Sequence, residues 1–433
     1  MTSPMTGRSA GYSYQAGEIQ SLIQIDATAC KGCDACKAFC PTNAINGASG
    51  AAHSIDNDKC LGCGQCMTNC PFNAIKQTSV AIDTVIKKLA DKNTTVVGII
   101  APAVRVAIGE EFGMPAGSLV TGQLYGAMNA ANMQIFDCNY AADITIMEEG
   151  TEFIQRLRSA LQGGGHDDDH GAHGVLPQFT SCCPAWVRYA ELKAPKALAN
   201  LSTTKSPMQI AGAITKTYGT EVYKAKPEQI FTVGVMPCTA KKIEASRPEF
   251  NAAYLHNNNL LGHGHGSNHN GEGYPDVDVV LTTAELAQLF KTLNIDLAAT
   301  ANYTPEGNPF AQYSGAGTIF GNTGGVMEAA LRTAYEVITG DKMPTLEYTP
   351  VRGLAGIKTA SIDLYDKTLG KDVTLKVAVV HDMANNIDQI LSEVNAGTSP
   401  YHFIEVMNCP GGCVNGAGQP QRNDGSSWLG NKA

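Results

Sequence analysis

Three short cysteine segments have the residue types and spacing of a buried metal site. They are Thr180-Ser181-Cys182-Cys183-Pro184, Met236-Pro237-Cys238 and Cys409-Pro410-Gly411-Gly412-Cys413. These five thiols lie far apart along the chain, so any site that they share must be assembled by folding. A cubane iron–sulfur cluster takes four thiolates. The fifth thiol is therefore either idle or does something other than hold iron.

Eight further cysteines form two C-x2-C-x2-C-x3-C-P arms near the N-terminus, and the second arm duplicates the first. In the bacterial two-cluster ferredoxin pattern, the fourth cysteine of each arm ligates the cluster of the other arm. The spacing predicts two 4Fe4S clusters, one held by Cys30, Cys33, Cys36 and Cys70 and the other by Cys60, Cys63, Cys66 and Cys40. Zinc is the alternative, but zinc ribbons pair C-x2-C arms without a trailing C-P.

The length and charge of the chain limit the kinds of protein that it can be. The chain has 433 residues, enough for two or three domains, and 31 basic against 40 acidic residues. This balance disfavours a nucleic-acid-binding surface and favours a basic redox partner. No apolar run approaches the roughly 20 residues that span a bilayer, so we expect no transmembrane segment. Cys138, the cysteine outside all motifs, is expected to be a small buried hydrophobe.

The patterns along the chain predict a tail and two domains. Residues 1–21 are rich in Ser, Gly and Thr and are expected to form an N-terminal tail. Residues 22–80 hold the duplicated arms with short strands and predict an α+β, two-cluster ferredoxin-like domain. In residues 81–433, apolar runs such as 231–236 alternate with helical patterns such as 151–161. They predict an α/β domain with a mixed sheet flanked by helices.

Two polar inserts interrupt this second domain, at residues 163–174 and 256–273. Both are rich in glycine and histidine, and such segments cannot bury enough apolar surface to pack. We therefore expect mobile surface loops. A divalent-metal trap is the alternative, because most of the histidines lie there.

The three late segments together resemble the signature segments of the iron-only (FeFe) hydrogenases. The matching stretches are FTSCCPAW, VMPCTAKKIE and FIEVMNCPGGCVNGAGQP, and the ferredoxin arms extend the resemblance over about residues 22–420. The layout is similar to that of the large subunit of the periplasmic two-subunit enzymes of sulfate reducers. The resemblance implies reversible conversion of two protons and two electrons to H2. It also implies a catalytic domain of two lobes with a buried H-cluster between them, a 4Fe4S cluster joined to a diiron subcluster with carbonyl, cyanide and azadithiolate.

The resemblance further implies a role for each late cysteine and its neighbours. The ligands of the active-site 4Fe4S cluster are matched by Cys183, Cys238, Cys409 and Cys413, the last of which also bridges to the diiron unit. Cys182 matches the proton donor, which accounts for the fifth thiol, and Lys241 matches a lysine that donates to a cyanide. Other pocket positions are matched by Pro102, Met236, Phe320 and Met407. For the methionines, ordinary core filling is the alternative.

Two glutamates, Glu149 and Glu152, share one face of a predicted helix, where burial could raise their pKa enough for proton transfer. Taken alone, they would more simply form a solvated helix face. The resemblance implies a proton path that runs from Cys182 to Glu149, Ser202 and Glu152, with Arg156 near its mouth. Glu148 is expected to point elsewhere.

Two residues depart from the family's usual pattern. Ala417 stands at a glycine position, where alanine is strained if φ is positive. Asn408 precedes Cys409 and places an amide near the cluster, where a hydrogen bond to sulfur would shift its potential.

The partners follow from the same resemblance. The chain ends soon after Pro420, so we expect a separate small subunit to complete the catalytic domain and to carry an export signal to the periplasm; a cytoplasmic location is the alternative. Ferredoxin or a c-type cytochrome is the expected electron partner. A sensory relative with low turnover and an iron–sulfur assembly protein are the rival functions. Such relatives tend to lack the proton-path residues, so Cys182, Glu149 and Glu152 argue against both.

Overall fold

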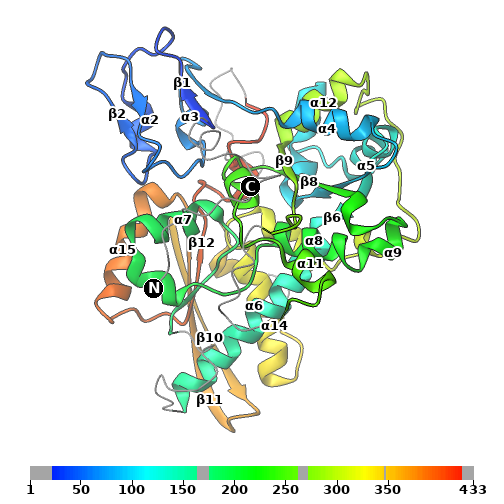
Figure 1. The fold of residues 1–433 in the computed structure, drawn as a ribbon. Coiled ribbons are helices and arrows are strands. Elements are labelled where there is room, and N and C mark those ends of the chain that lie inside the picture. The colour runs from blue at the N-terminus through cyan, green and yellow to red at the C-terminus, as the bar shows by residue number, and fades with distance from the viewer. Residues whose placement is uncertain (1–21, 163–174, 262–271, 346–347, 422–433) are drawn as a thin grey trace.

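The computed structural model describes residues 22–162, 175–261, 272–345 and 348–421. A small cysteine-rich unit, blue in Figure 1, lies beside two larger lobes that are each built on a β-sheet. The expected tail at 1–21 and the insert at 163–174 lie outside the described residues. The second insert begins later than expected, because His256 and Asn257 complete helix α11 (Ala252–Asn257), and its residues 262–271 also lie outside.

The cysteine-rich unit consists of two small antiparallel sheets and two one-turn helices. Its elements are β1 (Ile23–Ile25) paired with β4 (Ile75–Gln77), β2 (Ile45–Asn46) paired with β3 (Ser54–Ile55), α2 (Ala35–Ala38) and α3 (Gln65–Thr68). Strand β1 precedes the first arm and its partner β4 follows the second arm. This pairing brings the two cysteine arms side by side. The fourth cysteine of each arm can ligate the cluster of the other arm only if the arms are close together.

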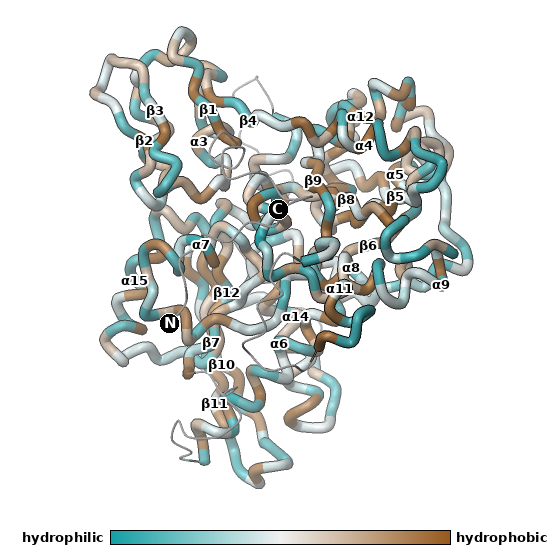
Figure 2. Tube along the Cα trace, in the orientation of Figure 1, coloured by the Kyte–Doolittle hydropathy of each residue, from teal (hydrophilic) through white to brown (hydrophobic). Residues whose placement is uncertain are grey.

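The first lobe contains a four-stranded sheet that is entirely parallel, where a mixed sheet was expected. Its strand order is β6 (Gln134–Asp137), β5 (Thr95–Ile100), β8 (Ile230–Met236) and β9 (Val279–Thr282). Every residue of β8 is buried, and Figure 2 shows hydrophobic residues along β8 and β9. Parallel strands need cover on both faces. The covering helices are α4 (Ala81–Ala90), α5 (Thr121–Ala130), α8 (Pro207–Lys216) and α12 (Thr283–Thr292).

The second lobe contains a mixed sheet. Its strand order is β10 (Ile357–Asp366), β11 (Lys371–Val380), β12 (Phe403–Val406) and β7 (Gln178–Phe179), with only the β10–β11 pair antiparallel. Side chains alternate between the faces of a strand. Val377 and Val379 therefore pack with α6 (Cys138–Leu161) and α14 (Gly325–Thr339), whereas Ala378 and Val380 pack with α7 (Pro184–Lys193) and α15 (Met383–Asn395).

The carboxyl ends of the parallel strands carry the expected functional residues. Pro102 follows β5, Cys182 follows β7, Cys238 follows β8 and Cys409 follows β12. In open α/β sheets, ligands bind at the carboxyl ends of the strands. Helix α6 connects the lobes, since Asp137 ends β6 in the first lobe and also caps α6, accepting a hydrogen bond from the backbone N–H of Asn139.

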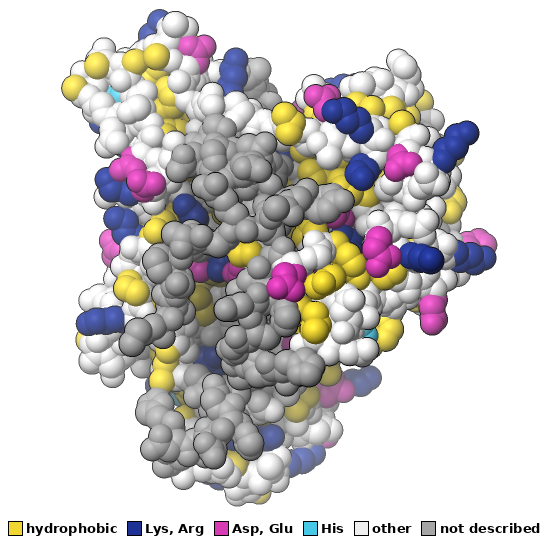
Figure 3. Space-filling view, in the orientation of Figure 1, with side chains coloured by type: hydrophobic (Ala, Val, Ile, Leu, Met, Phe, Trp, Pro, Cys, Tyr) yellow, Lys and Arg dark blue, Asp and Glu magenta, His cyan; other side chains and the backbone are white. Residues whose placement is uncertain are grey.

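The surface carries charges of both signs. On the face shown in Figure 3, Lys and Arg side chains are interspersed with Asp and Glu side chains. Among the described helices, none combines the length and the apolar character that a bilayer span requires.

Candidate active site

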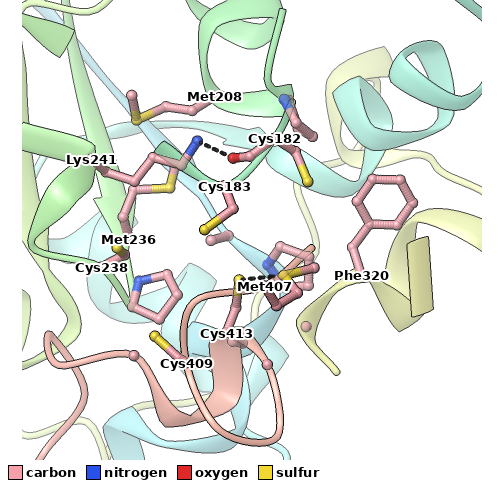
Figure 4. Close-up of a pocket in the computed structure, with 18 of the residues that line it drawn as sticks. Cys182, Cys183, Met208, Met236, Cys238, Lys241, Phe320, Met407, Cys409 and Cys413 are labelled. Atoms are coloured by element: carbon pink, nitrogen blue, oxygen red, sulfur yellow. Dashed lines mark hydrogen bonds between the residues drawn. The ribbon is translucent and has the colours of Figure 1, made fainter. Parts of the chain in front are cut away.

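A cavity between the two lobes brings the late cysteines together (Figure 4). It contains about 800 Å³ of space that no protein atom occupies. All five late thiols line it, and so do the other residues expected there: Pro102, Met236, Lys241, Phe320 and Met407. Met208 of α8 and Cys138 of α6 also line the cavity. Neither was expected there, because no motif marks either residue as part of the site.

The Cys182-Cys183-Pro184 sequence points two adjacent thiols in different directions. Proline is favoured at the first position of a helix, and here Pro184 starts α7 with Cys183 as its N-cap. The buried Trp186 fixes this turn by donating from its indole N–H to the carbonyl of Thr180 at 3.1 Å. Figure 4 shows the Cys182 sulfur turned toward Phe320 and the Cys183 sulfur turned away from it, toward the side of Cys238, Cys409 and Cys413. The structure thus separates four thiols from the fifth.

The group of four suits a metal cluster by its chemistry. Burial raises the pKa of Cys238 to about 12 and also raises the pKa values of Cys183, Cys409 and Cys413. Without a metal these groups would be neutral thiols at pH 7, whereas thiolates ligate iron. All four thiols line the same cavity. Four thiolates are the ligand set of a 4Fe4S cluster, so the donor set fits one.

Lys241 lies beside Cys182 in the cavity wall. Its ammonium donates to the carbonyl of Cys182 at 3.1 Å and to Oε2 of Glu244 at 2.6 Å. Burial alone would lower the pKa of Lys241, but the Glu244 carboxylate, together with Cys182 and Cys238, acts in the opposite direction and the pKa is raised. The protein itself therefore supplies an anionic partner for this buried charge.

A hydrogen-bonded group of polar residues runs from the cavity toward the surface along α6. Glu149 is buried, and burial raises its pKa to about 8, although a hydrogen bond with Ser202 acts in the opposite direction. Its Oε2 has no hydrogen-bond partner among the described residues. The Ser202 hydroxyl donates to Oε2 of Glu152 at 3.0 Å. Glu149 also interacts electrostatically with Cys182, so the expected order of groups is present in space.

Arg156 contacts Glu152, the outermost carboxylate of this group, but its own side chain is buried. Its side chain is only 1% exposed, against 13% for Glu152. It donates to Oε1 of Glu152 at 2.5 Å and to the carbonyl of Leu201 at 2.9 Å. Both terminal nitrogens of the buried guanidinium have acceptors, whereas its Nε has no partner among the described residues. Glu152 is the more exposed member of the pair. Glu148 is exposed on α6, as expected.

The N-terminal thiols separate into the two predicted groups. Cys30, Cys33, Cys36 and Cys70 line one small pocket. In the other group, burial raises the pKa of Cys66, and Cys40, Cys60 and Cys63 each contribute to raising it further, as does Cys36 of the first group. The duplication extends to hydrogen bonds, because the backbone N–H of Ala44 donates to Cys40 Sγ at 3.2 Å and that of Ala74 donates to Cys70 Sγ at 3.3 Å.

The two groups differ in their distance from the cavity. Cys33 is exposed, whereas Cys63 packs in the same hydrophobic cluster as Cys183 and Cys238. The group around Cys63 therefore lies between the surface group and the cavity.

Two departures from the family pattern look different in three dimensions. Ala417 is not among the residues with positive φ, so the expected strain is absent there. The Asn408 amide lies 4.0 Å from Cys409 Sγ. The closer donor to this sulfur is Gln65, whose Nε2 lies 3.1 Å away. Gln65 was missed, and the only signal for it was that the matching position in the first arm is Ala35.

Cys138 is buried, as expected, at the first turn of α6. Burial raises the pKa of its thiol to about 12. It is therefore a neutral member of the cavity wall at physiological pH.

Comparisons with known proteins agree with this geometry. A family model described as the C-terminal domain of the iron-only hydrogenase large subunit matches residues 94–417, and a 4Fe-4S binding domain matches residues 23–46 and 53–76. The chain is 46% identical over 404 residues to the periplasmic Fe hydrogenase large subunit of Nitratidesulfovibrio vulgaris. The aligned region covers 92% of this chain and 86% of that protein.

More distant relatives give the same result. Iron hydrogenase 1 of Clostridium pasteurianum is 42% identical over 76% of this chain, which spans 50% of that longer protein. A solved FeFe-hydrogenase structure superposes with a TM-score of 0.66 at 34% identity and covers 81% of this chain and 87% of its own.

Proposed function

The chain belongs to the family of iron-only hydrogenase large subunits, and from this premise we propose which of its residues hold the cofactors and which move protons. It is a hydrogenase that interconverts H2 with two protons and two electrons, and it carries two 4Fe4S clusters and an H-cluster. One observation carries the residue roles. In a single cavity, four thiols face one another while Cys182 turns away from them.

The four grouped thiols would hold the 4Fe4S part of the H-cluster, and Cys413 would also connect it to the diiron part. The four residues are Cys183, Cys238, Cys409 and Cys413. When bound, the cofactor supplies the metal site where protons and electrons combine. Pro102, Met236, Phe320 and Met407 form an apolar wall that keeps water from the reacting atoms. An ammonium has three N–H donors, and two of those on Lys241 find acceptors among the described residues. The third is left for an anionic ligand of the cofactor, such as the cyanide expected from the resemblance.

Protons reach the cavity through side chains of α6 and the loop that contains Ser202. Glu152, the most exposed of these groups, takes a proton from solvent, and Arg156 holds its carboxylate in place. The Ser202 hydroxyl links Glu152 to Glu149. Burial raises the pKa of Cys182 well above its ordinary value, so its resting form is a neutral thiol that holds a proton. Once the Cys182 sulfur has given up this proton in the cavity, the resulting thiolate would recover one from the Glu149 carboxyl.

Electrons travel through the ferredoxin-like unit. Cys30, Cys33, Cys36 and Cys70 would hold the outer cluster, at which electrons from a ferredoxin or a c-type cytochrome would enter, because Cys33 is exposed. Cys60, Cys63, Cys66 and Cys40 would hold the cluster nearer the cavity, since Cys63 packs with Cys183 and Cys238.

The quaternary state and location follow from the Nitratidesulfovibrio relative. That relative is the large subunit of a periplasmic enzyme, which supports a heterodimer of this chain with a small subunit in the periplasm. A cytoplasmic enzyme is the alternative.

The decisive test is replacement of the proton donor. Cys182→Ser should keep the carbonyl and cyanide infrared bands of the H-cluster and lose nearly all turnover, because an alcohol holds its proton much more tightly than a thiol does. Cys138→Ser is the matched control, since it changes another buried thiol of the same cavity and should keep most of the turnover. Substantial activity in Cys182→Ser with intact bands would remove the proton-donor role.

A further inference from the structure

The second ferredoxin arm is built into the wall of the catalytic domain. The hydroxyl of Thr239, the residue after Cys238, donates to the carbonyl of Gly62 at 2.6 Å, and Arg188 Nε of α7 donates to the carbonyl of Cys60 at 3.0 Å. A Cβ at Gly64 would lie 2.5 Å from the Cβ of Ala417. These contacts leave the arm little freedom to move relative to the cavity.

From this arm one side chain reaches the active-site cysteines. Gln65 is 4% exposed, and its Nε2 lies 3.1 Å from Cys409 Sγ, although the two residues are 344 positions apart. This distance is short for an N–H···S hydrogen bond. Gln65 also precedes Cys66 directly, so one residue joins the backbone of a relay ligand to the sulfur of an active-site ligand.

The duplicated arms differ where the second one meets the catalytic domain. Lys31, Asp34 and Ala35 of the first arm correspond to Leu61, Gly64 and Gln65 of the second. Leu61 and Gln65 are buried, whereas Lys31 is exposed. The apolar side chain of Leu61 and the lack of a side chain at Gly64 both allow the second arm to pack closely against the catalytic domain. Packing alone gives no reason for a buried amide at position 65, because a buried polar group is unfavourable unless it is hydrogen-bonded.

We infer that Gln65 is a positioning residue for the active-site cluster, which donates a hydrogen bond to the Cys409 sulfur and thereby raises the reduction potential of that cluster from within the ferredoxin-like domain. The inference rests on the proposed ligation of the cluster by Cys409. Reduction adds negative charge to a cluster and its thiolates. A donor aimed at one sulfur therefore stabilises the reduced form more than the oxidised form, and hydrogen bonds to sulfur are among the factors that set cluster potentials.

The expected size of the effect follows from the strength of such a bond. A hydrogen bond to a charged acceptor changes an equilibrium by roughly tenfold or more. Removing the amide should therefore lower the ratio of reduced to oxidised active-site cluster about tenfold at a fixed potential, which is about 59 mV for a one-electron couple. The two ferredoxin clusters should keep their own potentials.

The test uses the full chain produced without the diiron subcluster, so that the active-site 4Fe4S cluster is observed without turnover. Redox titrations followed by electron paramagnetic resonance would compare the wild type with Gln65→Leu and Gln65→Met, which keep the bulk of the side chain and remove its donors. Asn408→Leu is the matched control, because it removes the amide that lies 4.0 Å from the same sulfur. We expect the tenfold effect in both Gln65 variants and a clearly smaller one in Asn408→Leu.

Three results would overturn the inference. The first is an unchanged cluster potential in both Gln65 variants when their iron content is full. The second is a shift in Asn408→Leu that is as large as the shift in the Gln65 variants. The third is loss of the active-site cluster from both Gln65 variants, because Gln65 would then have a structural role. A wild-type chain without a third 4Fe4S signal would instead refute the proposed ligation itself, so the two failures are distinguishable.

Discussion

Replacement of Glu149 by glutamine is the sharpest test of the proton path. The substitution keeps the size and polarity of the side chain but replaces one carboxyl oxygen with an amide NH2, which does not act as an acid or a base near pH 7. Burial raises the pKa of this carboxyl from 4.5 to about 8, which corresponds to about 5 kcal/mol in favour of the protonated form. The carboxyl is thus about ten to one protonated at pH 7 and about one to ten at pH 9.

The direction of the pH dependence follows from this ratio. Glu149 can give a proton to Cys182 only when it is protonated, so H2 evolution should be constant below pH 7, half-maximal near pH 8 and about tenfold lower at pH 9. H2 oxidation needs the ionised form as acceptor and should show the opposite trend. A positioned acid–base group contributes about 10²–10⁴-fold to a rate. Glu149→Gln should therefore lose about that factor in both directions.

The assay is film electrochemistry at a fixed driving force between pH 6 and 9, with infrared spectra to confirm an intact H-cluster. Glu148→Gln is the matched control, because Glu148 is the adjacent residue of α6 but its side chain is exposed. It should retain wild-type turnover. Glu149→Gln enzyme that keeps more than a tenth of the activity with normal infrared bands would refute the reasoning, and so would an equal loss in Glu148→Gln.

Two further substitutions test the neighbouring structure. Ser202→Ala removes the hydroxyl that links the two glutamates and should slow turnover on the order of 10²-fold. Thr203→Val removes an exposed hydroxyl that also donates to Glu152, and it should change turnover little. Similar rates in both variants would count against the link through Ser202. Gly64→Ala should lower stability by about 1–3 kcal/mol from positive φ and further through its contact with Ala417, so its melting temperature should fall below that of Gly50→Ala, where φ is also positive but the space is open. Equal melting temperatures would show that the junction is not tightly packed.

The sequence was most informative where function depends on local spacing. The grouping of the ferredoxin cysteines follows from intervals within two short arms, and the structure brings the same groups together. A continuous apolar run likewise indicated the buried strand β8. In both cases, the pattern that carries the signal lies within a short stretch of the sequence.

Contacts that depend on the folded structure could not be predicted from the sequence in this way. Gln65 and Cys409 are 344 residues apart, and a single glutamine carries no periodic signal. The burial of Arg156 depends on carbonyl groups from a separate loop, among them that of Leu201. Lys241 has a carboxylate partner only because Glu244 lies one helical turn away and its side chain turns back toward the cavity. Backbone acceptors and side-chain directions of this kind are properties of the fold.

In the function proposed above, electrons and protons reach the cavity from different sides, and the arrangement of the fold accounts for this separation. Figure 4 shows Cys409 and Cys182 at opposite ends of the labelled cysteines. Gln65 of the ferredoxin-like unit donates a hydrogen bond to the sulfur of Cys409. Cys182 interacts electrostatically with Glu149 of α6. Each side therefore needs only one kind of chemistry. Polar, titratable groups lie along α6, while thiols and apolar side chains such as Leu61 and Cys63 lie along the electron path.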